Sequence, residues 1–186
     1  MATTDTYTLT NFIDDLDRIT REETTAERIT ARTAPLLARL VRDPRSIPAH
    51  YLTSPAGRRG RYMLHRARMF NVTSVVWRPG DRATAHNHET WGVIGVIDNE
   101  IEETRYRVSD AGGGRARLEV TSVTRHGAGA VSQLVPGDEV HAMHNRTARD
   151  TVEIHVYGKD LVGLRRRRWD DDGTEKPLVS DKYLNC

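Results

Sequence analysis

The chain has 186 residues, a formal net charge of +2 and 37% hydrophobic residues. This length is enough for one domain with a core of its own, without disulfides or structural zinc. Cys186 is the only cysteine, which excludes an intrachain disulfide and a cysteine-based metal site and favours a reducing compartment.

The N-terminal segment is acidic and polar, and no apolar run approaches the length of a bilayer. We therefore expect a soluble, cytoplasmic protein without a membrane partner. Arginines gather in "GRRGRYMLHRAR" (57–68) and "LRRRRW" (164–169), which raises nucleic acid as a partner. Because the net charge is small and aromatic residues are not interleaved as a stacking platform requires, we expect no nucleic-acid partner.

Two helices are predicted near the N-terminus. Apolar residues recur at helical spacing over residues 9–20, which predicts an amphipathic helix. A second helix is predicted over about 25–42, where "APLLARLVRD" carries the apolar residues, with Thr33 as a candidate N-cap and Pro35 in a first turn.

After residue 60 the sequence changes to short runs rich in Val, Ile, Thr, Tyr and Trp, separated by turns such as "PGD", "DN" and the hairpin tip "SDAGGG". Many short strands without intervening helices favour an antiparallel sandwich or small barrel over a Rossmann-type sheet. We expect one domain, in which a helical segment (1–50) packs on a barrel with a C-terminal extension (51–186).

His86 and His88 stand two residues apart at the head of the apolar run in "AHNHETWGVIGVI". If residues 84–88 are extended, both side chains project to the same face. His141 follows the turn in "PGDEVHAMHN". Three neutral imidazoles on a barrel wall can bind a divalent metal and leave positions free for substrate. On its own, a His-x-His pair on a strand is more often an exposed or hydrogen-bonded pair.

The spacing around these histidines resembles the two motifs of the cupin superfamily, in order. The first motif runs from Gly80 to the histidine pair, and the second from Pro136 through His141 to Asn145. The resemblance implies a mainly β fold: a cupin double-stranded β-helix, or jelly-roll barrel, with N-terminal helices and a metal inside the barrel.

One departure narrows the resemblance. The glutamate that cupins usually place four or five residues after the second histidine falls at Gly92 or Val93, and Glu89 is predicted to point to the opposite face. Three-histidine cupins include the thiol dioxygenases. The segments "FNVTSVVWRPGD", "HNHETWGVIGV" and "EIHVYGKDL" are similar to the cysteine dioxygenase family, closest to bacterial members that include 3-mercaptopropionate dioxygenases, over about residues 58–170.

This family implies a non-haem Fe(II) enzyme whose ligands fall on His86, His88 and His141. Its reaction adds both atoms of O2 to the sulfur of a small carboxylate thiol, of the cysteine or 3-mercaptopropionate type, and gives a sulfinic acid. Because neutral imidazoles leave Fe(II) its full double charge, an anionic thiolate is a favoured ligand.

The family's catalytic histidine and tyrosine fall on His155 and Tyr157, which share a face of the strand "TVEIHVYG". If that face is inward, Tyr157 offers its hydroxyl to bound substrate or oxygen, and His155 orients it. Without the family, both would be read as core residues with satisfied polar tips. Two family features are absent: Glu153 stands where relatives often have serine, and no cysteine is expected to cross-link the tyrosine.

Arginine is the candidate for the substrate carboxylate. Animal members of the family use an arginine early in the barrel, and "RYML" places Arg61 there, whereas bacterial mercaptopropionate enzymes draw one from after the tyrosine motif. The candidates there are Arg165, Arg166 and Arg168, of which the last two share a face.

Two other functions remain compatible with these motifs. A cupin isomerase, decarboxylase or C–C-cleaving dioxygenase would use the same metal cage, although such enzymes more often retain the glutamate. A non-catalytic cupin that binds a metal or ligand is the second. The sequence predicts neither the physiological thiol nor the oligomeric state.

Overall fold

The computed structural model describes residues 6–113 and 115–186. Two helices come first, α1 (Leu9–Glu22) and α2 (Ala26–Val41), and two short 3-10 turns follow them (Pro44–Ser46 and Ala49–Tyr51). No helix in these residues is both long and apolar enough to cross a bilayer.

Threonine side chains cap both helices. Thr8 caps α1 and Thr25 caps α2, each by accepting a hydrogen bond from a backbone amide in the first turn. The prediction that Thr33 caps the second helix is wrong, because Thr33 and Pro35 lie inside α2. Buried apolar residues on both sides of the proline hold the helix against the core, so tertiary packing overrides the local start signal.

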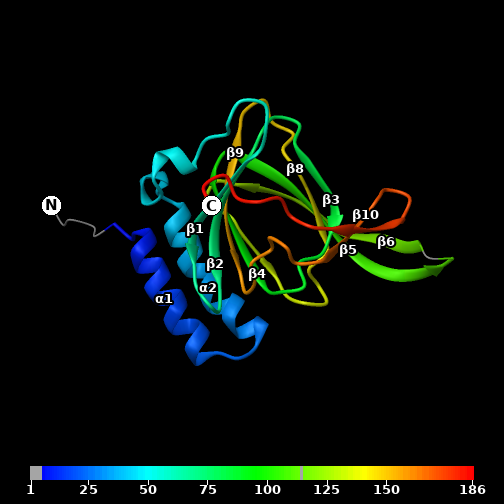
Figure 1. Cartoon of the computed structure of the whole chain (residues 1–186), viewed down its shortest axis with the longest axis horizontal. Coiled ribbons are helices and arrows are strands. Elements are labelled where there is room, and N and C mark those ends of the chain that lie inside the picture. Colours follow the sequence, from blue (N-terminus) through cyan, green and yellow to red (C-terminus); the bar gives the residue numbers. More distant parts are fainter. Residues whose placement is uncertain (1–5, 114) are drawn as a thin grey trace.

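The rest of the chain forms two antiparallel sheets (Figure 1). The first has five strands in the spatial order β1 (Gly60–Arg66), β2 (Asn71–Trp77), β9 (Thr151–Tyr157), β4 (Gly92–Asp98) and β7 (Val131–Leu134). The second has six strands in the order β11 (Glu175–Leu178), β10 (Arg166–Trp169), β3 (Arg82–His86), β8 (His141–His144), β5 (Glu100–Gly112) and β6 (Arg115–Gly127).

Successive strands alternate between the sheets. From β2 the chain crosses to β3, returns to β4, enters the β5–β6 hairpin, and then passes through β7, β8 and β9 on alternate sheets. Four neighbouring strands of the first sheet (β2, β9, β4 and β7) thus interleave along the chain with four of the second (β3, β8, β5 and β6). This arrangement is jelly-roll topology. The predicted fold class, a mainly β double-stranded β-helix (jelly-roll barrel) with N-terminal helices, is confirmed. The C-terminal extension adds β10 and β11, which the sequence did not predict as strands, beside β3.

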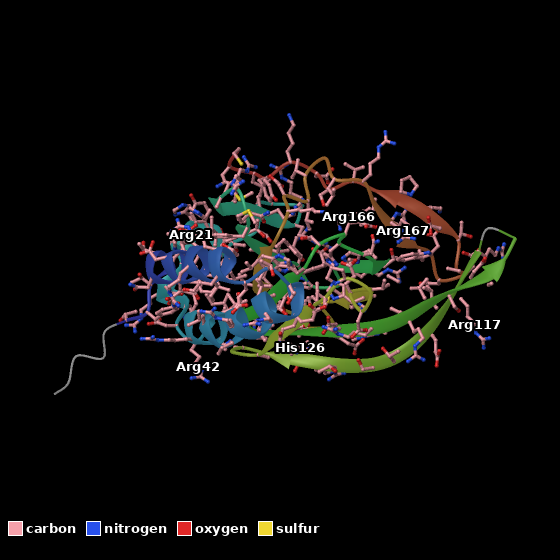
Figure 2. All side chains as sticks on the ribbon, turned by 90° about the horizontal axis from the view of Figure 1, so that it is seen from below. Arg21, Arg42, Arg117, His126, Arg166 and Arg167 are labelled. Atoms are coloured by element: carbon pink, nitrogen blue, oxygen red, sulfur yellow. The ribbon has the colours of Figure 1, made fainter. Side chains whose placement is uncertain are left out.

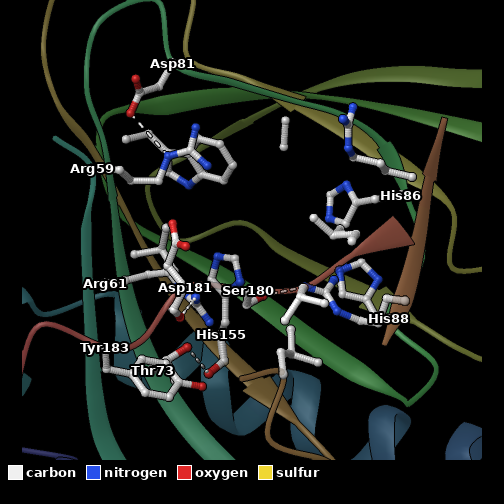
Figure 3. Close-up of a pocket in the computed structure, with 18 of the residues that line it drawn as sticks. Arg59, Arg61, Thr73, Asp81, His86, His88, His155, Ser180, Asp181 and Tyr183 are labelled. Carbon is white, nitrogen blue, oxygen red and sulfur yellow. Dashed lines mark hydrogen bonds and ion pairs between the residues drawn. The ribbon is translucent and has the colours of Figure 1, made fainter. Parts of the chain in front are cut away.

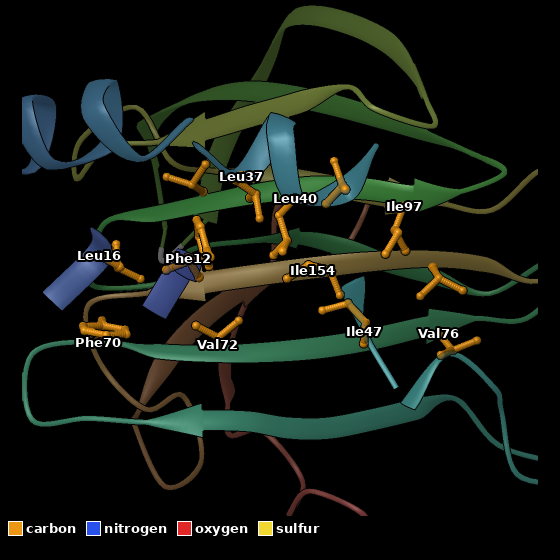
Figure 4. Packing of buried hydrophobic residues seen from close by; sticks show 14 residues of the cluster. Phe12, Leu16, Leu37, Leu40, Ile47, Phe70, Val72, Val76, Ile97 and Ile154 are labelled. Carbon is orange, nitrogen blue, oxygen red and sulfur yellow. The ribbon is translucent and has the colours of Figure 1, made fainter. Parts of the chain in front are cut away.

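The helices cover the outer face of the five-stranded sheet (Figure 4). Phe12 and Leu16 of α1, together with Leu37 and Leu40 of α2, pack on the valines and isoleucines of β2, β4 and β9. Burying each side chain of this size contributes roughly 1.5–3 kcal/mol. Gly95 lets α2 approach closely, since a Cβ there would lie 3.0 Å from Leu37 Cγ.

The inner face of the same sheet carries both apolar and polar residues. Val75, Trp77 and Val96 pack against Ile101 and Met143 of the opposite sheet and close one part of the barrel. Strand β9 turns its odd-numbered side chains inward, and these are polar: Thr151, Glu153, His155 and Tyr157. The interior of the barrel therefore has an apolar part and a polar part.

The β5–β6 hairpin extends away from the barrel (Figure 2). Most residues of β6 are exposed, including Val120 at 54% and Val123 at 59%. The predicted glycine-rich tip connects the two strands, and Gly112 and Gly113 have positive φ angles of 79° and 63° there. Gly114 lies outside the described residues.

Candidate metal centre

Three histidines converge at one end of the barrel. His86 is the last residue of β3 and lies directly opposite His141, the first residue of β8. His88 lies two residues beyond the end of β3. The side chains of His86 and His88 therefore converge although residues 84–88 do not all belong to a strand. The candidate ligand atoms all lie within 4.8 Å of one another. The three ring centroids are 4.8–4.9 Å apart, which is close to a regular triangle.

Hydrogen bonds from the outer ring nitrogens orient two of the imidazoles. His86 Nδ1 lies 2.8 Å from the Thr84 carbonyl oxygen, and His141 Nδ1 lies 2.7 Å from Glu103 Oε1. Because a backbone carbonyl can only accept, His86 Nδ1 carries the proton and Nε2 keeps its lone pair. The Glu103 carboxylate likewise accepts a hydrogen bond from His141 Nδ1, and such a partner raises the basicity of a ligating ring nitrogen.

Glu103 and Glu139 support the centre from outside the histidine cluster. Glu103 is 3% exposed and also bonds His126 and Ser132. Burial opposes its charge, but the hydrogen bonds from His126 and His141 hold the pKa of Glu103 well below its usual value. Glu139 accepts the backbone N–H of His88 at 2.9 Å, which fixes the loop after β3.

The histidines have the properties of a metal-binding set. Burial, and then the neighbouring imidazoles, lower the pKa of His86 and His88 well below its usual value, so both rings are uncharged at neutral pH. His88 Nδ1 is buried without a hydrogen-bond partner among the described residues. Three neutral nitrogen donors fit a divalent transition metal such as iron, and three protein ligands leave further positions open.

A tyrosine ring takes the space where cupins usually place a glutamate. Gly92 lies opposite Tyr157 in the β4–β9 pairing, and a Cβ at Gly92 would lie 2.7 Å from Tyr157 Cε1. Glu89 accepts a hydrogen bond from Asn87, and its side chain is 43% exposed, away from the cluster. The metal-binding set found in residues 6–113 and 115–186 therefore consists of histidines alone.

A hydrogen-bonded relay runs along the inner face of β9. The Tyr157 hydroxyl lies 2.9 Å from His155 Nδ1, and His155 Nε2 lies 3.0 Å from Glu153 Oε2. Trp77 Nε1 donates to the same carboxylate oxygen at 2.6 Å. With Glu153 accepting from Nε2, His155 Nδ1 keeps a lone pair that accepts the tyrosine proton.

Tyr157 connects this relay to the histidine cluster. Its ring stacks on His88 with centroids 5.2 Å apart and an interplanar angle of 18°. Burial raises the pKa of Tyr157 well above its usual value, so the phenol is protonated at neutral pH. Glu153 therefore joins His155 and Tyr157 in one hydrogen-bonded series. The sequence did not predict the contribution of Trp77.

Three of the four predicted arginines line one cavity of about 650 Å³, which His86, His88 and Tyr157 also line (Figure 3). Arg61 donates to the Asp181 carbonyl oxygen at 2.8 Å and lies over the Tyr183 ring. Arg166 is 5% exposed and donates to the Asn87 carbonyl oxygen at 3.0 Å.

The other two arginine candidates have different surroundings. Arg168 lines the same cavity and pairs with Asp170 at 2.9 Å, whereas Arg165 is exposed. Residues 179–184 form part of the cavity wall. Sequence reasoning did not find this wall, because it carries neither a motif nor a hydrophobic period. Glu103 and Glu139 were also missed, although Glu103 shares a face of its strand with buried Ile101.

No family model matches the sequence. Among solved structures, a conserved protein with a double-stranded β-helix domain from Klebsiella pneumoniae is 18% identical, with a TM-score of 0.44 over 72% of this chain and 94% of its own. The cupin domain of an XRE-family transcriptional regulator from Enterobacter cloacae is 17% identical, with a TM-score of 0.41 over 55% and 97%. A cupin superfamily protein from Desulfitobacterium hafniense is 11% identical, with a TM-score of 0.45 over 63% and 94%. These similarities assign no activity to the chain.

Proposed function

We propose that this protein is a non-haem Fe(II) thiol dioxygenase that adds both atoms of O2 to the sulfur of a small carboxylate thiol and releases a sulfinic acid. The observation that carries this proposal is the joining of a three-histidine cluster to the Glu153–His155–Tyr157 relay through the Tyr157 ring. A metal site without an acid favours an anionic substrate ligand, and a relay beside it can hold a proton for the reaction.

His86, His88 and His141 would hold the metal. When bound, Fe(II) supplies adjacent positions at which a thiolate and O2 meet. The three imidazoles add no negative charge, so a thiolate is favoured over a neutral ligand. Imidazole donors also suit zinc, copper and nickel, so the identity of the metal is part of the proposal.

The chain's own residues would orient the substrate and manage a proton. The Tyr157 hydroxyl faces the cavity and is held by His155 Nδ1 at 2.9 Å, so it can donate to, or accept from, a bound group without leaving its position. Arginine binds a carboxylate bidentately, and Arg61 and Arg166 are cavity arginines that donate to neutral oxygen atoms and form no ion pair among the described residues.

Oxygen consumption tests the proposal. Protein loaded with Fe(II) should consume O2 only when L-cysteine or 3-mercaptopropionate is present, and mass spectrometry should find a product heavier by two oxygen atoms. Zn(II)-loaded protein is the control and should be inactive. Full iron occupancy without thiol-dependent oxygen uptake would contradict the proposal and favour another class of cupin.

Cysteamine separates the roles of sulfur and carboxylate, because it has the thiol without the acid. Loss of the arginine that holds the carboxylate, tested in Arg61→Ala and in Arg166→Lys, should raise KM for carboxylate thiols by a factor equivalent to about 1.5–3 kcal/mol, the range for hydrogen bonds to charged groups. Turnover of cysteamine should change little. If Arg61→Ala impaired turnover of carboxylate thiols and of cysteamine equally, Arg61 would stabilise the fold and not bind the substrate carboxylate.

A further inference from the structure

The arginines around the cavity fall into two groups. Arg59 pairs with Asp81 at 3.2 Å, and Arg168 pairs with Asp170 at 2.9 Å. Arg61 and Arg166 form no ion pair within residues 6–113 and 115–186 and donate only to neutral oxygen atoms. Carboxylates thus hold Arg59 and Arg168, whereas neutral groups hold Arg61 and Arg166.

Consecutive residues of one segment hold the guanidinium groups of Arg61 and Arg166. Arg166 Nη2 donates to the Ser180 hydroxyl, and Arg61 Nη1 donates to the Asp181 carbonyl oxygen at 2.8 Å. Ser180 and Asp181 are consecutive, and consecutive Cα atoms are about 3.8 Å apart. The segment therefore holds two cations at neighbouring points of the same wall, and Figure 3 shows Arg61, Ser180 and Asp181 facing the cavity with the histidines.

Arg166 is the nearer of the two to the metal centre. Its Nη1 donates to the carbonyl oxygen of Asn87, the residue between His86 and His88. The side chain is 5% exposed, and its Nε–H is buried without a hydrogen-bond partner among the described residues. Arg61 lies further out and is half-buried, over the Tyr183 ring.

A buried cation near a second, half-buried cation is unfavourable when neither forms an ion pair. A desolvated charge is costly unless it is paired and hydrogen-bonded. Burial lowers the pKa of Arg166 and the charge of Arg61 also lowers it, whereas Tyr157 and Glu139 partly oppose this shift. A ligand that brings two negative groups would remove this repulsion and satisfy the buried Nε–H. A ligand with one carboxylate would leave one guanidinium unpaired.

We propose that the substrate carries two carboxylates, one for Arg166 beside the metal centre and one for Arg61 further out. This inference rests on the thiol dioxygenase function proposed above and names its substrate class as dicarboxylate thiols. A cavity of about 650 Å³ is ample for such a molecule, since pockets of roughly 300–1,000 Å³ hold drug-sized ligands.

The first experiment measures binding without catalysis. Calorimetry compares succinate with propionate, both without sulfur, on the metal-free protein. We expect succinate to bind about 10–100-fold more tightly, the range for one further charge-assisted contact. Arg61→Gln should remove most of this advantage. Arg58→Ala, which removes an exposed cation from the same cavity rim, should keep it.

Arg166 is buried, so its replacement needs a variant that keeps the charge. Arg166→Lys retains the cation and loses the planar fork, and the melting temperature shows whether it folds. In folded protein it should weaken succinate binding and leave metal affinity unchanged. Equal binding of succinate and propionate to the unmodified protein, or a succinate preference that survives both Arg61→Gln and Arg166→Lys, would overturn the two-carboxylate site.

The second experiment is oxygen uptake by the iron-loaded protein with mercaptosuccinate and 3-mercaptopropionate. We expect kcat/KM to be about 10–100-fold higher for mercaptosuccinate, and Arg61→Gln to reduce this ratio. Activity on 3-mercaptopropionate without any preference for mercaptosuccinate would overturn this inference and leave the dioxygenase proposal standing. Tight, arginine-dependent succinate binding without oxygen uptake on any thiol would overturn the dioxygenase proposal and support the dianion site.

Discussion

The two faces of strand β9 differ in their contacts. The outward side chains Val152, Ile154 and Val156 pack under the helices, whereas the inward Glu153 and His155 belong to the polar relay. All of them are buried, so burial alone does not distinguish a structural residue from a functional one. The difference lies in what each side chain contacts: apolar groups on one face, and hydrogen-bond partners that lead to a metal site on the other.

This comparison predicts that inner-face substitutions change metal binding and turnover, and that outer-face substitutions change stability. The largest expected effect is on the metal. His141→Ala removes one of three ligands and should abolish most iron binding, as measured by metal analysis after dialysis. His144→Ala, at the other end of β8, should retain iron. Full occupancy in His141→Ala would show that the metal binds elsewhere.

Tyr157→Phe should lower kcat by about 10²–10⁴-fold, the range for general acid–base groups. The hydroxyl is removed while the ring that stacks on His88 remains, so iron content and melting temperature should change little. Tyr106→Phe, on the opposite sheet, is the matched control. An unchanged turnover rate would make Tyr157 a packing residue like its outward neighbours.

Ile154→Ala tests the outer face. Ile154 is fully buried, and its truncation should cost about 2–5 kcal/mol in the free energy of unfolding. Denaturant titration measures this loss, and folded protein should keep its metal affinity. Val120→Ala removes a side chain that is 54% exposed and should stay within about 0.5 kcal/mol of the unmodified protein. Loss of metal affinity in folded Ile154→Ala would show that the two faces are coupled.

Glu103→Gln should have the smallest of these effects. Residues that orient a metal ligand typically contribute 10–100-fold in affinity, and Glu103 holds His141 Nδ1 at 2.7 Å. Competition with a chelator, using Co(II) as the probe, measures the change. Glu102→Gln alters the neighbouring carboxylate, which pairs with Arg146 instead, and should leave affinity unchanged. Equal Co(II) affinities in Glu103→Gln and Glu102→Gln would show that Glu103 does not contribute to metal binding.

Much of the fold could be predicted from the sequence, because local patterns carry it. Helical spacing located α1 and α2, and alternating runs between turn residues located the long strands. The bounds of α2 agree with the prediction, but its N-cap was wrongly assigned to Thr33, since local capping signals are weaker than the packing of a whole apolar face. The short strands β10 and β11 were not found, because neither the arginine-rich segment RRRW of β10 nor the segment EKPL of β11 has hydrophobic alternation.

The sequence by itself determined the chemical types of the candidate site: three histidines at motif spacing, a histidine and tyrosine on one strand face, and a choice of arginines. Only the tertiary structure decided which groups meet. Strand register brings His141 opposite His86, and Trp77 reaches Glu153 across β2 and β9. Residues 180–181 hold Arg61 and Arg166 from 120 and 14 positions away. Contacts over such separations depend on how the sheets close, and no local period in a sequence encodes them.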